Sequence, residues 1–179
     1  MDLILRETAP DDQESLLAVH KLAFGSDEEA QLAGDLLADP SAEPRCSLMA
    51  LNADRPVGHI LFSKAGLEPD LPLQAAILAP LAVLPGYQRQ GIGGKLIQRG
   101  LQSLREGGFH LVFVLGSPFY YPRHGFLPAI PAGFNPPYSL PPENQNDWMY
   151  QSFGPASWGS YQGKIRPAAA LDKPVYWWG

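Results

Sequence analysis

The sequence predicts a mixed α/β fold, in which a largely antiparallel sheet contains one parallel pair of strands. Residues 47–53 and 57–64 are apolar segments joined by a short Asn-Ala-Asp-Arg-Pro turn, the pattern of an antiparallel hairpin. Residues 74–84 and 110–115 are strand-like segments on either side of a helical pattern. A strand, a helix and a strand in that order favour a parallel pair with a right-handed crossover.

Length and composition set broad limits on the function. The chain has 179 residues, enough for one domain or one domain plus an extension. Its formal net charge is -5 and its Lys and Arg residues are not clustered, which argues against nucleic acid as a partner. The sequence has no apolar run long enough to cross a bilayer and no signal-like start. The single cysteine, Cys46, excludes an internal disulfide and favours a cytoplasmic location.

The first forty residues predict a strand followed by two helices. Residues 3–6 form the strand, and the helical patterns cover residues 12–24 and 27–38, the second stopped by Asp-Pro. His20 is expected on the helix surface or partly buried, because nothing around it resembles a metal site. No metal is therefore expected. His59 could face a substrate cleft, although a structural role is the simpler interpretation.

The region from Leu81 to Leu104 is the main functional signal. An apolar segment ends at a proline, a polar turn follows, and glycines at 91, 93 and 94 open an amphipathic helix that Gly107-Gly108 closes. The first N–H groups of a helix have no carbonyl partner and carry the positive end of its dipole. Glycines allow a diphosphate to approach this backbone closely. The segment therefore predicts a cradle for a phosphate-bearing cofactor.

Two common phosphate loops do not fit this segment. A P-loop would need glycine at position 89, occupied by Arg89, and Ser or Thr at position 96, occupied by Leu96. A dinucleotide-binding fingerprint starting at Gly91 needs its third glycine at the same Leu96. The pattern Gln/Arg-x-x-Gly-x-Gly/Ala does fit, as Gln88-Arg89-Gln90-Gly91-Ile92-Gly93 preceded by Leu-x-Val-x-Pro. It resembles the acyl-coenzyme A cradle of the GNAT superfamily of N-acetyltransferases.

A second segment strengthens this resemblance. Residues 116–126 read Gly-Ser-Pro-Phe-Tyr-Tyr-Pro-Arg-His-Gly-Phe. Their ending is similar to the GNAT segment that delivers a tyrosine to the thioester sulfur, and the spacing from Gly125 selects Tyr121. A subgroup of predicted acetyltransferases, with Leu-Gly-Asp-Pro-x-Tyr-Tyr-x-Arg-Phe-Gly-Phe here, is more similar still. The chain departs from that subgroup at Ser117 and His124, and we expect these departures to affect the acceptor side more than the coenzyme.

The resemblance implies a single GNAT domain over residues 1–179, with helices on both faces of the sheet. Residues 1–129 would form the core with the acetyl-CoA site, and residues 130–179 a proline- and aromatic-rich extension that completes the sheet and pocket. The parallel strands 74–84 and 110–115 would splay around the cofactor. In the family the first of these strands carries a bulge, which Pro80 would mark. An edge strand with a tolerated proline is the alternative.

The implied activity is acetyl transfer from acetyl-CoA to an amine, a small molecule or a protein amine, by direct attack in a ternary complex. Tyr121 would protonate the leaving thiolate, with Tyr120 as the fallback. The expected cofactor-binding residues are Leu81, Ala82, Val83, Gln88, Arg89, Gln90, Gly91, Ile92, Gly93, Gly94, Lys95 and Ser117.

Several questions stay open from sequence. The general base could be bulk water or one of five side chains, namely Glu28, Glu29, His59, Glu68 and Asp70. The acceptor is not specified, and a homodimer is an open option. A coenzyme A-binding regulatory or sensor module with little catalysis is one alternative. A transferase for a longer acyl group or an oxygen acceptor is another.

The last third of the chain gives weaker signals. Eight of the nineteen prolines lie in residues 118–142, so no regular element is expected there. Residues 147–153 and 162–166 read as weak strands, and residues 175–178 as a final one. The four tryptophans, at positions 148, 158, 177 and 178, would fill core or interface or line a pocket.

Overall fold

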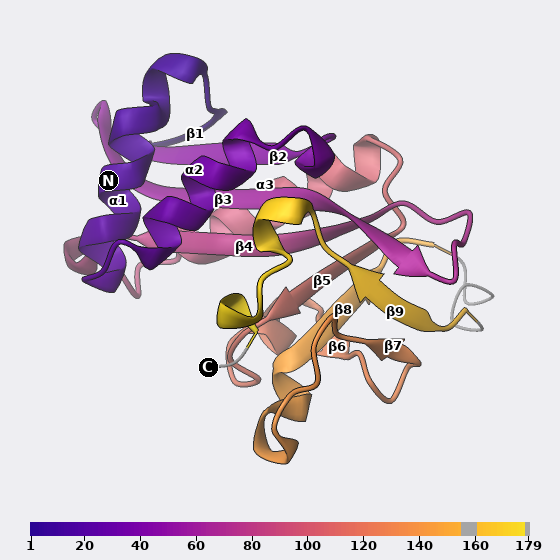
Figure 1. Ribbon diagram of the computed structural model, residues 1–179. Helices are drawn as coiled ribbons and strands as arrows, with labels where there is room; N and C mark the ends of the chain where they lie inside the picture. Colours follow the sequence, from indigo (N-terminus) through magenta and orange to yellow (C-terminus); the bar gives the residue numbers. More distant parts are fainter. Residues whose placement is uncertain (155–160, 178–179) are drawn as a thin grey trace.

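The computed structural model describes residues 1–154 and 161–177 (Figure 1). The three α-helices of this part of the chain are α1 (Gln13–Phe24), α2 (Glu28–Ala38) and α3 (Ile92–Glu106). Its longer strands are β1 (Leu3–Glu7), β2 (Cys46–Asn52), β3 (Arg55–Glu68), β4 (Ala75–Val83), β5 (Leu111–Leu115), β8 (Trp148–Ser152) and β9 (Gly163–Arg166). Two short strands are β6 (Leu127–Pro128) and β7 (Phe134–Asn135). None of the described helices is long and apolar enough to cross a membrane.

The strands form one mixed sheet in the order β1-β2-β3-β4-β5-β8-β6, and β9 pairs with β3 and β7. Neighbours from β1 to β4 are antiparallel, whereas β4 and β5 are parallel. The predicted mixed sheet with a central parallel pair is therefore confirmed. Strand β8, from the last third of the chain, pairs along the whole of β5 and so extends the sheet beyond it.

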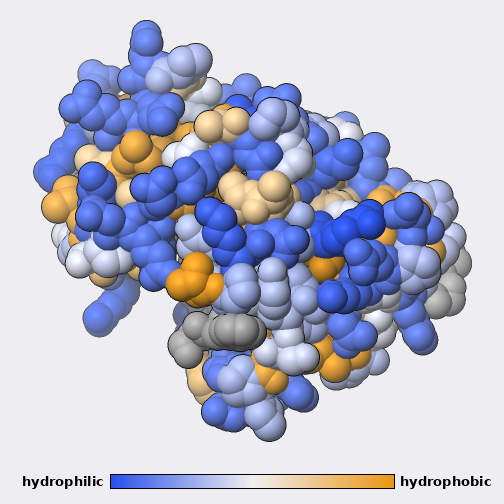
Figure 2. All heavy atoms as spheres, in the orientation of Figure 1, coloured by the Kyte–Doolittle hydropathy of each residue, from blue (hydrophilic) through white to orange (hydrophobic). Residues whose placement is uncertain are grey.

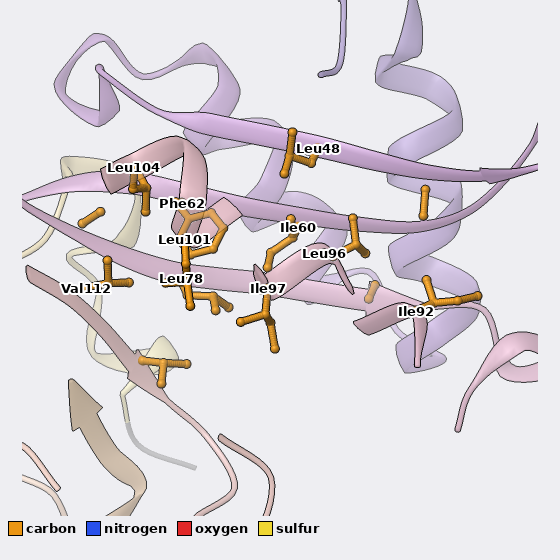
Figure 3. Packing of buried hydrophobic residues seen from close by; sticks show 14 of the residues in the cluster. Leu48, Ile60, Phe62, Leu78, Ile92, Leu96, Ile97, Leu101, Leu104 and Val112 are labelled. Atoms are coloured by element: carbon orange, nitrogen blue, oxygen red, sulfur yellow. The ribbon is translucent and has the colours of Figure 1, made fainter. Parts of the chain in front are cut away.

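Helices cover both faces of the sheet (Figure 1). On one face, α3 packs its apolar side against β2, β3 and β4; Figure 3 shows Leu96, Ile97 and Leu101 pointing at Ile60, Phe62 and Leu78. Burying one such side chain contributes about 1.5–3 kcal/mol. On the other face, Leu32 and Leu36 of α2 pack against the sheet. The amphipathic pattern of residues 92–104 thus fixes the position of the α3 N-terminus relative to β4.

Strand β4 is interrupted at Pro80, as predicted. Its pairing with β3 shifts register between Ile60 and Phe62, opposite Leu81 and Leu78, so Ala79 and Pro80 form a bulge. Its parallel pairing with β5 ends earlier, at Ile77 opposite Phe113. The two strands separate beyond that pair, a divergence that is visible in Figure 1. Because β4 lies between β3 and β5, the edge-strand interpretation of Pro80 is wrong.

His20 is fully buried, whereas a surface or partly buried position was expected. Helix α1 lies against β3, and the side chains of His20 and His59 are both fully buried between them. Their ring nitrogens Nε2 and Nδ1 lie 2.8 Å apart. His59 also contacts the Ser47 hydroxyl through its other nitrogen, at 2.8 Å. His59 is therefore a structural residue within this layer and not part of a cleft wall.

Two expectations for the last third of the chain are wrong. The proline-rich region contains β6, β7 and a 3₁₀ helix, Pro142–Asp147, because prolines are compatible with edge strands and the first turn of a helix. Residues 174–176 form a 3₁₀ helix instead of a final strand. Trp177 is buried there and donates its indole N–H to the Leu171 carbonyl at 2.9 Å. Trp158 and Trp178 lie outside the described residues.

Candidate functional site

The turn between β4 and α3 presents a run of unpaired backbone donors. The N–H groups of residues 88–94 donate no hydrogen bond within the described part of the chain, and the first bond of α3 runs from Lys95 N–H to the Gly91 carbonyl at 3.0 Å. Arg89 and Gly91 have positive φ angles of 60° and 84°. Alternating left-handed residues turn successive N–H groups toward one side, which makes an anion-binding nest. This nest continues into the N-terminus of α3, where the helix dipole favours negative charge.

Two glycines of this cradle pack closely against aromatic side chains. A Cβ at Gly93 would lie 2.7 Å from the Tyr120 hydroxyl oxygen, and one at Gly94 would lie 3.0 Å from Cε1 of His124. Both contacts come from the segment after β5, which therefore closes over the first turn of α3. The cradle is thus bounded by the helix N-terminus on one side and by two aromatic side chains on the other.

Between its last pair with β5 and this cradle, β4 has an unpaired backbone edge, which we call the slot. Leu84 donates its N–H to Val57 of β3, so by the alternation of strand backbones Ala82 also faces β3. Leu81 and Val83 then direct their N–H and C=O groups toward the separated side of β5. The Val83 carbonyl accepts a hydrogen bond from the Gln88 side chain at 2.9 Å, which orders the start of the turn. An extended, amide-containing chain could pair with this side of β4 as an added strand.

Two tyrosines follow β5 and lie against different glycines. The ring of Tyr121 packs where a Cβ on Gly116 would stand, next to the end of β5, whereas the Tyr120 hydroxyl lies at Gly93. Burial raises the pKa of both phenols, and the proximity of Tyr120 raises that of Tyr121 further. Within residues 1–154 and 161–177, the fully buried side-chain N and O atoms that lack a hydrogen-bond partner belong to His20, Ser63 and Gln151. Neither tyrosine hydroxyl is thus a fully buried atom without a partner, and both hydroxyls stay protonated at neutral pH.

The other residues singled out from sequence have distinct positions. Ile92 is buried in the core, so only its backbone N–H is available to a ligand. The side chains of Arg89, Gln90 and Lys95 are exposed around the cradle. Ser117 caps the turn that carries the tyrosines, since its hydroxyl accepts the Phe119 N–H at 3.2 Å. An aspartate at this position would make the same kind of cap, so the serine is a conservative departure.

The sequence comparison predicted that the departure at His124 affects the acceptor side more than the coenzyme. Its ring lies over Gly94, on the α3 face of the sheet, together with the cradle. It lines the same surface pocket as Gly91, Lys95 and Arg99. The departure from the aromatic residue common in the subgroup therefore falls on the side of the cradle. The position of His124 depends on its distance in space from the N-terminus of α3, which cannot be read from the sequence.

A second pocket, of about 290 Å³, opens on the opposite face of the sheet, where β4 and β5 separate. Its floor includes Ala79, Pro80 and Leu115, and Val175, Tyr176 and Trp177 lie on one side. In Figure 1 this C-terminal segment lies in front of the gap between β4 and β5. Figure 2 shows the same face of the molecule as mostly hydrophilic, with hydrophobic residues in scattered groups.

Glutamates supply the charge of this second pocket. Glu28 and Glu29, in the first turn of α2, line it, and no lysine, arginine or histidine is among its described lining residues. Glu28, Glu29 and Asp35 contribute to the raised pKa of the Tyr176 phenol, after the larger effect of burial. The other two candidate bases, Glu68 and Asp70, are absent from this lining and pair with Arg166 at 3.7 Å and 2.8 Å. Within the described residues, no three His, Cys, Asp or Glu side chains gather as a metal site would require.

Comparison with known proteins gives consistent matches. Residues 13–126 match the model of the acetyltransferase (GNAT) family. The chain is 48% identical over 148 residues to the uncharacterized N-acetyltransferase YjhQ of Escherichia coli K12, covering 81% of each chain. Among solved structures, GNAT family N-acetyltransferase YhbS from Escherichia coli, in complex with CoA, matches with a TM-score of 0.87 and 26% identity over 97% of this chain and 93% of that one.

A second solved structure is a GNAT family acetyltransferase from Brucella melitensis in complex with acetyl-CoA. It matches with a TM-score of 0.75 and 28% identity, and the match covers 95% of this chain and 98% of that one. The family model matches more than half of the chain, and YjhQ is 48% identical to it over 81% of its length. This chain belongs to the acetyltransferase (GNAT) family.

Proposed function

We propose that the protein transfers an acetyl group from acetyl-CoA to an amine by direct attack in a ternary complex. The acceptor would carry a second, positively charged group besides the amine that is acetylated. The observation that carries this proposal is the run of unpaired N–H groups over residues 88–94 at the mouth of a slot beside β4. Similar proteins were solved with CoA and with acetyl-CoA, which supports the same ligand here.

The coenzyme would lie along the cradle and the slot. The backbone N–H groups of residues 89–94 would bind the pyrophosphate, and the exposed side chains of Arg89 and Lys95 would add positive charge. The backbones of Leu81 and Val83 would pair with the pantetheine amides. The alternation of β4 makes Ala82 the weakest of the three predicted contacts, because its backbone groups face β3.

Tyr121 is the proposed general acid. The amine nitrogen attacks the thioester carbonyl carbon, the tetrahedral intermediate collapses, and the carbon–sulfur bond breaks toward the sulfur. The thiolate then needs a proton or a hydrogen bond, which a protonated phenol supplies. Tyr121 lies beside Gly116 at the end of β5, whereas the Tyr120 hydroxyl lies at Gly93, where the pyrophosphate would bind. The tyrosine pair also supports membership of the Tyr-Tyr subgroup as part of this proposal.

The acceptor would enter from the glutamate-lined pocket on the opposite face. Ala79 and Pro80 of β4 line this pocket and directly precede Leu81 of the slot, so an amine held there would lie near the thioester. Its volume of about 290 Å³ is near the lower end for small-ligand sites. Glu28 and Glu29 favour a cationic group, and a carboxylate or water receives the proton that the amine loses.

Thiol release from acetyl-CoA, measured across a panel of amines, tests this function. We expect transfer to small amines that carry a second positive charge and little transfer to carboxylate-bearing amines of the same size. Glu28→Gln and Glu29→Gln should raise KM for the cationic acceptors and leave KM for acetyl-CoA unchanged. Glu14→Gln, on α1 outside the pocket lining, is the matched control. Coenzyme binding without transfer to any amine would instead support a sensor.

Two further parts of the proposal concern the protein's state. A cytoplasmic location is consistent with a single, free cysteine, Cys46, whose thiol pKa is raised by burial to about 11. A homodimer would be tested by light scattering of the purified protein over a range of concentrations.

A further inference from the structure

We propose that His124 is a coenzyme-recognition residue, whose imidazolium binds a phosphate group of the coenzyme at the N-terminus of α3. The inference rests on the proposed coenzyme site and adds a residue that the cradle motif does not contain. It also makes coenzyme affinity depend on pH in the range where a histidine titrates.

The position of the ring carries the inference. Cε1 of His124 lies 3.0 Å from the point where a Cβ on Gly94 would stand, and the two ring nitrogens lie 3.8 and 3.9 Å from it. Gly94 is the third residue of α3, and its N–H is one of the unpaired donors of the cradle. An anion bound to those donors would therefore be within reach of the imidazole.

The ring is held in place but its polar atoms are free. Tyr120 packs edge-to-face against it, with ring centroids 5.0 Å apart. Neither ring nitrogen has a hydrogen-bond partner among residues 1–154 and 161–177. An oriented imidazole without a protein partner, next to unpaired amides, is arranged to bind a ligand rather than to stabilise the fold.

The surrounding charges all favour an anion. The pocket that His124 lines also contains Lys95, Arg99 and Arg105 of α3. Its uncharged polar members are Gln98 and Gln102 of α3 and Gln151 of β8, and no described lining residue is a carboxylate. Arg123 precedes the ring on its own 3₁₀ helix, and the Tyr120 phenol packs against it. Among the described residues that line this pocket, none is acidic, so none competes with a phosphate for the imidazolium.

Binding should therefore be coupled to proton uptake. In the free protein, partial burial and the charge of Arg123 lower the pKa of His124 from its ordinary value, so the ring is largely neutral at pH 7. A bound phosphate would favour the charged form and raise this pKa. Affinity should then fall as the pH rises from about 6 to 8, because the neutral ring loses the charge-assisted bond.

Calorimetry of CoA binding tests the inference without requiring turnover. At pH 6 we expect His124→Phe to weaken CoA binding by about tenfold, with His124→Gln between it and the wild type. At pH 8 the difference between His124→Phe and wild type should shrink to less than threefold. Titrations in buffers of different ionisation enthalpy should show proton uptake by the wild type that His124→Phe lacks. Arg123→Gln is the control that removes a neighbouring charge without removing the imidazole.

Coenzyme fragments identify the phosphate concerned. If His124→Phe also weakens the binding of 3′-dephospho-CoA, the pyrophosphate is the partner of His124. If His124→Phe has no effect on the binding of 3′-dephospho-CoA, the 3′-phosphate is the partner. Each of these results supports the proposal. Removing the 3′-phosphate also removes its own titration near pH 6 from the profile. Equal affinity of wild type and His124→Phe for CoA at pH 6, in a variant with an unchanged unfolding midpoint, overturns the proposal. Failure of the wild type to bind CoA would contradict the proposed function itself.

Discussion

A buried chain of hydrogen bonds between α1 and β3 predicts a loss of stability in mild acid. Thr8 donates its hydroxyl to Ser47 at 2.6 Å, and the Ser47 hydroxyl lies 2.8 Å from His59 Nε2. His59 Nδ1 in turn lies 2.8 Å from His20 Nε2, so one neutral ring donates to the other. Both rings are neutral in this arrangement. Burial lowers the pKa of His20 to about 4, and burial together with repulsion from His20 lowers the pKa of His59 to about 3.

The sign and size of the effect follow from these values. An unfolded histidine titrates near pKa 6.5, so below that pH the unfolded chain binds protons that the folded chain excludes. Stability is therefore complete above about pH 6.5 and falls as the pH is lowered toward the folded values. Two pH units at 1.36 kcal/mol per unit give about 2.7 kcal/mol for each histidine at pH 4.5. Together this is about 5 kcal/mol, comparable with the whole stability of a small domain.

Urea unfolding at pH 7.5, 6.0, 5.0 and 4.5 measures the loss. We expect a slope of about 2.5 kcal/mol per pH unit near pH 5, reduced to about half in His20→Gln or His59→Gln. The low pKa of Asp12, about 2, arises mainly from its hydrogen bond with Arg6, so loss of that interaction begins only below about pH 4. A wild-type unfolding free energy that is the same at pH 7.5 and 5.0 would refute the neutral buried pair.

Two further predictions concern the site. Gly93→Ala should weaken CoA binding about tenfold, because its Cβ would fill the space between the cradle and the Tyr120 hydroxyl. Gly86→Ala is the control and should bind CoA normally, because a Cβ at Gly86 has no atom within 4 Å. Equal calorimetric affinities of the two variants for CoA would exclude close approach of the coenzyme at Gly93. Tyr121→Phe should lower kcat at least tenfold with CoA affinity nearly intact, while Tyr120→Phe should mainly weaken affinity; the reverse pattern in steady-state kinetics would exchange their roles.

The sequence was sufficient for the features that local chemistry determines. The glycines at 91, 93 and 94, between an apolar segment and an amphipathic helix, predicted a phosphate cradle, and the structure has unpaired amides there. Pro80 predicted an interruption of β4, because proline cannot complete a ladder, and a bulge lies there. Both signals act within a few residues along the chain.

Features that depend on distant segments could not be obtained in this way. The sequence does not show that residues 120–124 fold over the α3 N-terminus, and therefore does not show that His124 lies over Gly94. Nor does it show that β3 pairs His59 with His20 of α1, and the burial of His20 was missed. Residues 175–178 have the composition of a strand, yet Pro174 begins a 3₁₀ helix, Pro174–Tyr176, against α2 and the sheet.

The alternation of β4 refines the sequence-based list of coenzyme contacts. Leu81, Ala82 and Val83 are equivalent in sequence, but the hydrogen bond from Leu84 to Val57 sets which of them face β3. Register is a property of the pair of strands and not of either strand alone. A side-chain mutation leaves the backbone groups of Leu81, Ala82 and Val83 in place. The difference between these residues is therefore best tested by NMR signals of their individual backbone amides.

Titration of CoA into ¹⁵N-labelled protein tests the central claim most directly. We predict saturable binding, with the largest shifts on the backbone amides of residues 88–94 and of Leu81 and Val83, and small shifts on Ala82. Binding that leaves the amides of residues 88–94 unchanged, or no binding of CoA or acetyl-CoA at all, would contradict the proposal that these unpaired donors hold the coenzyme.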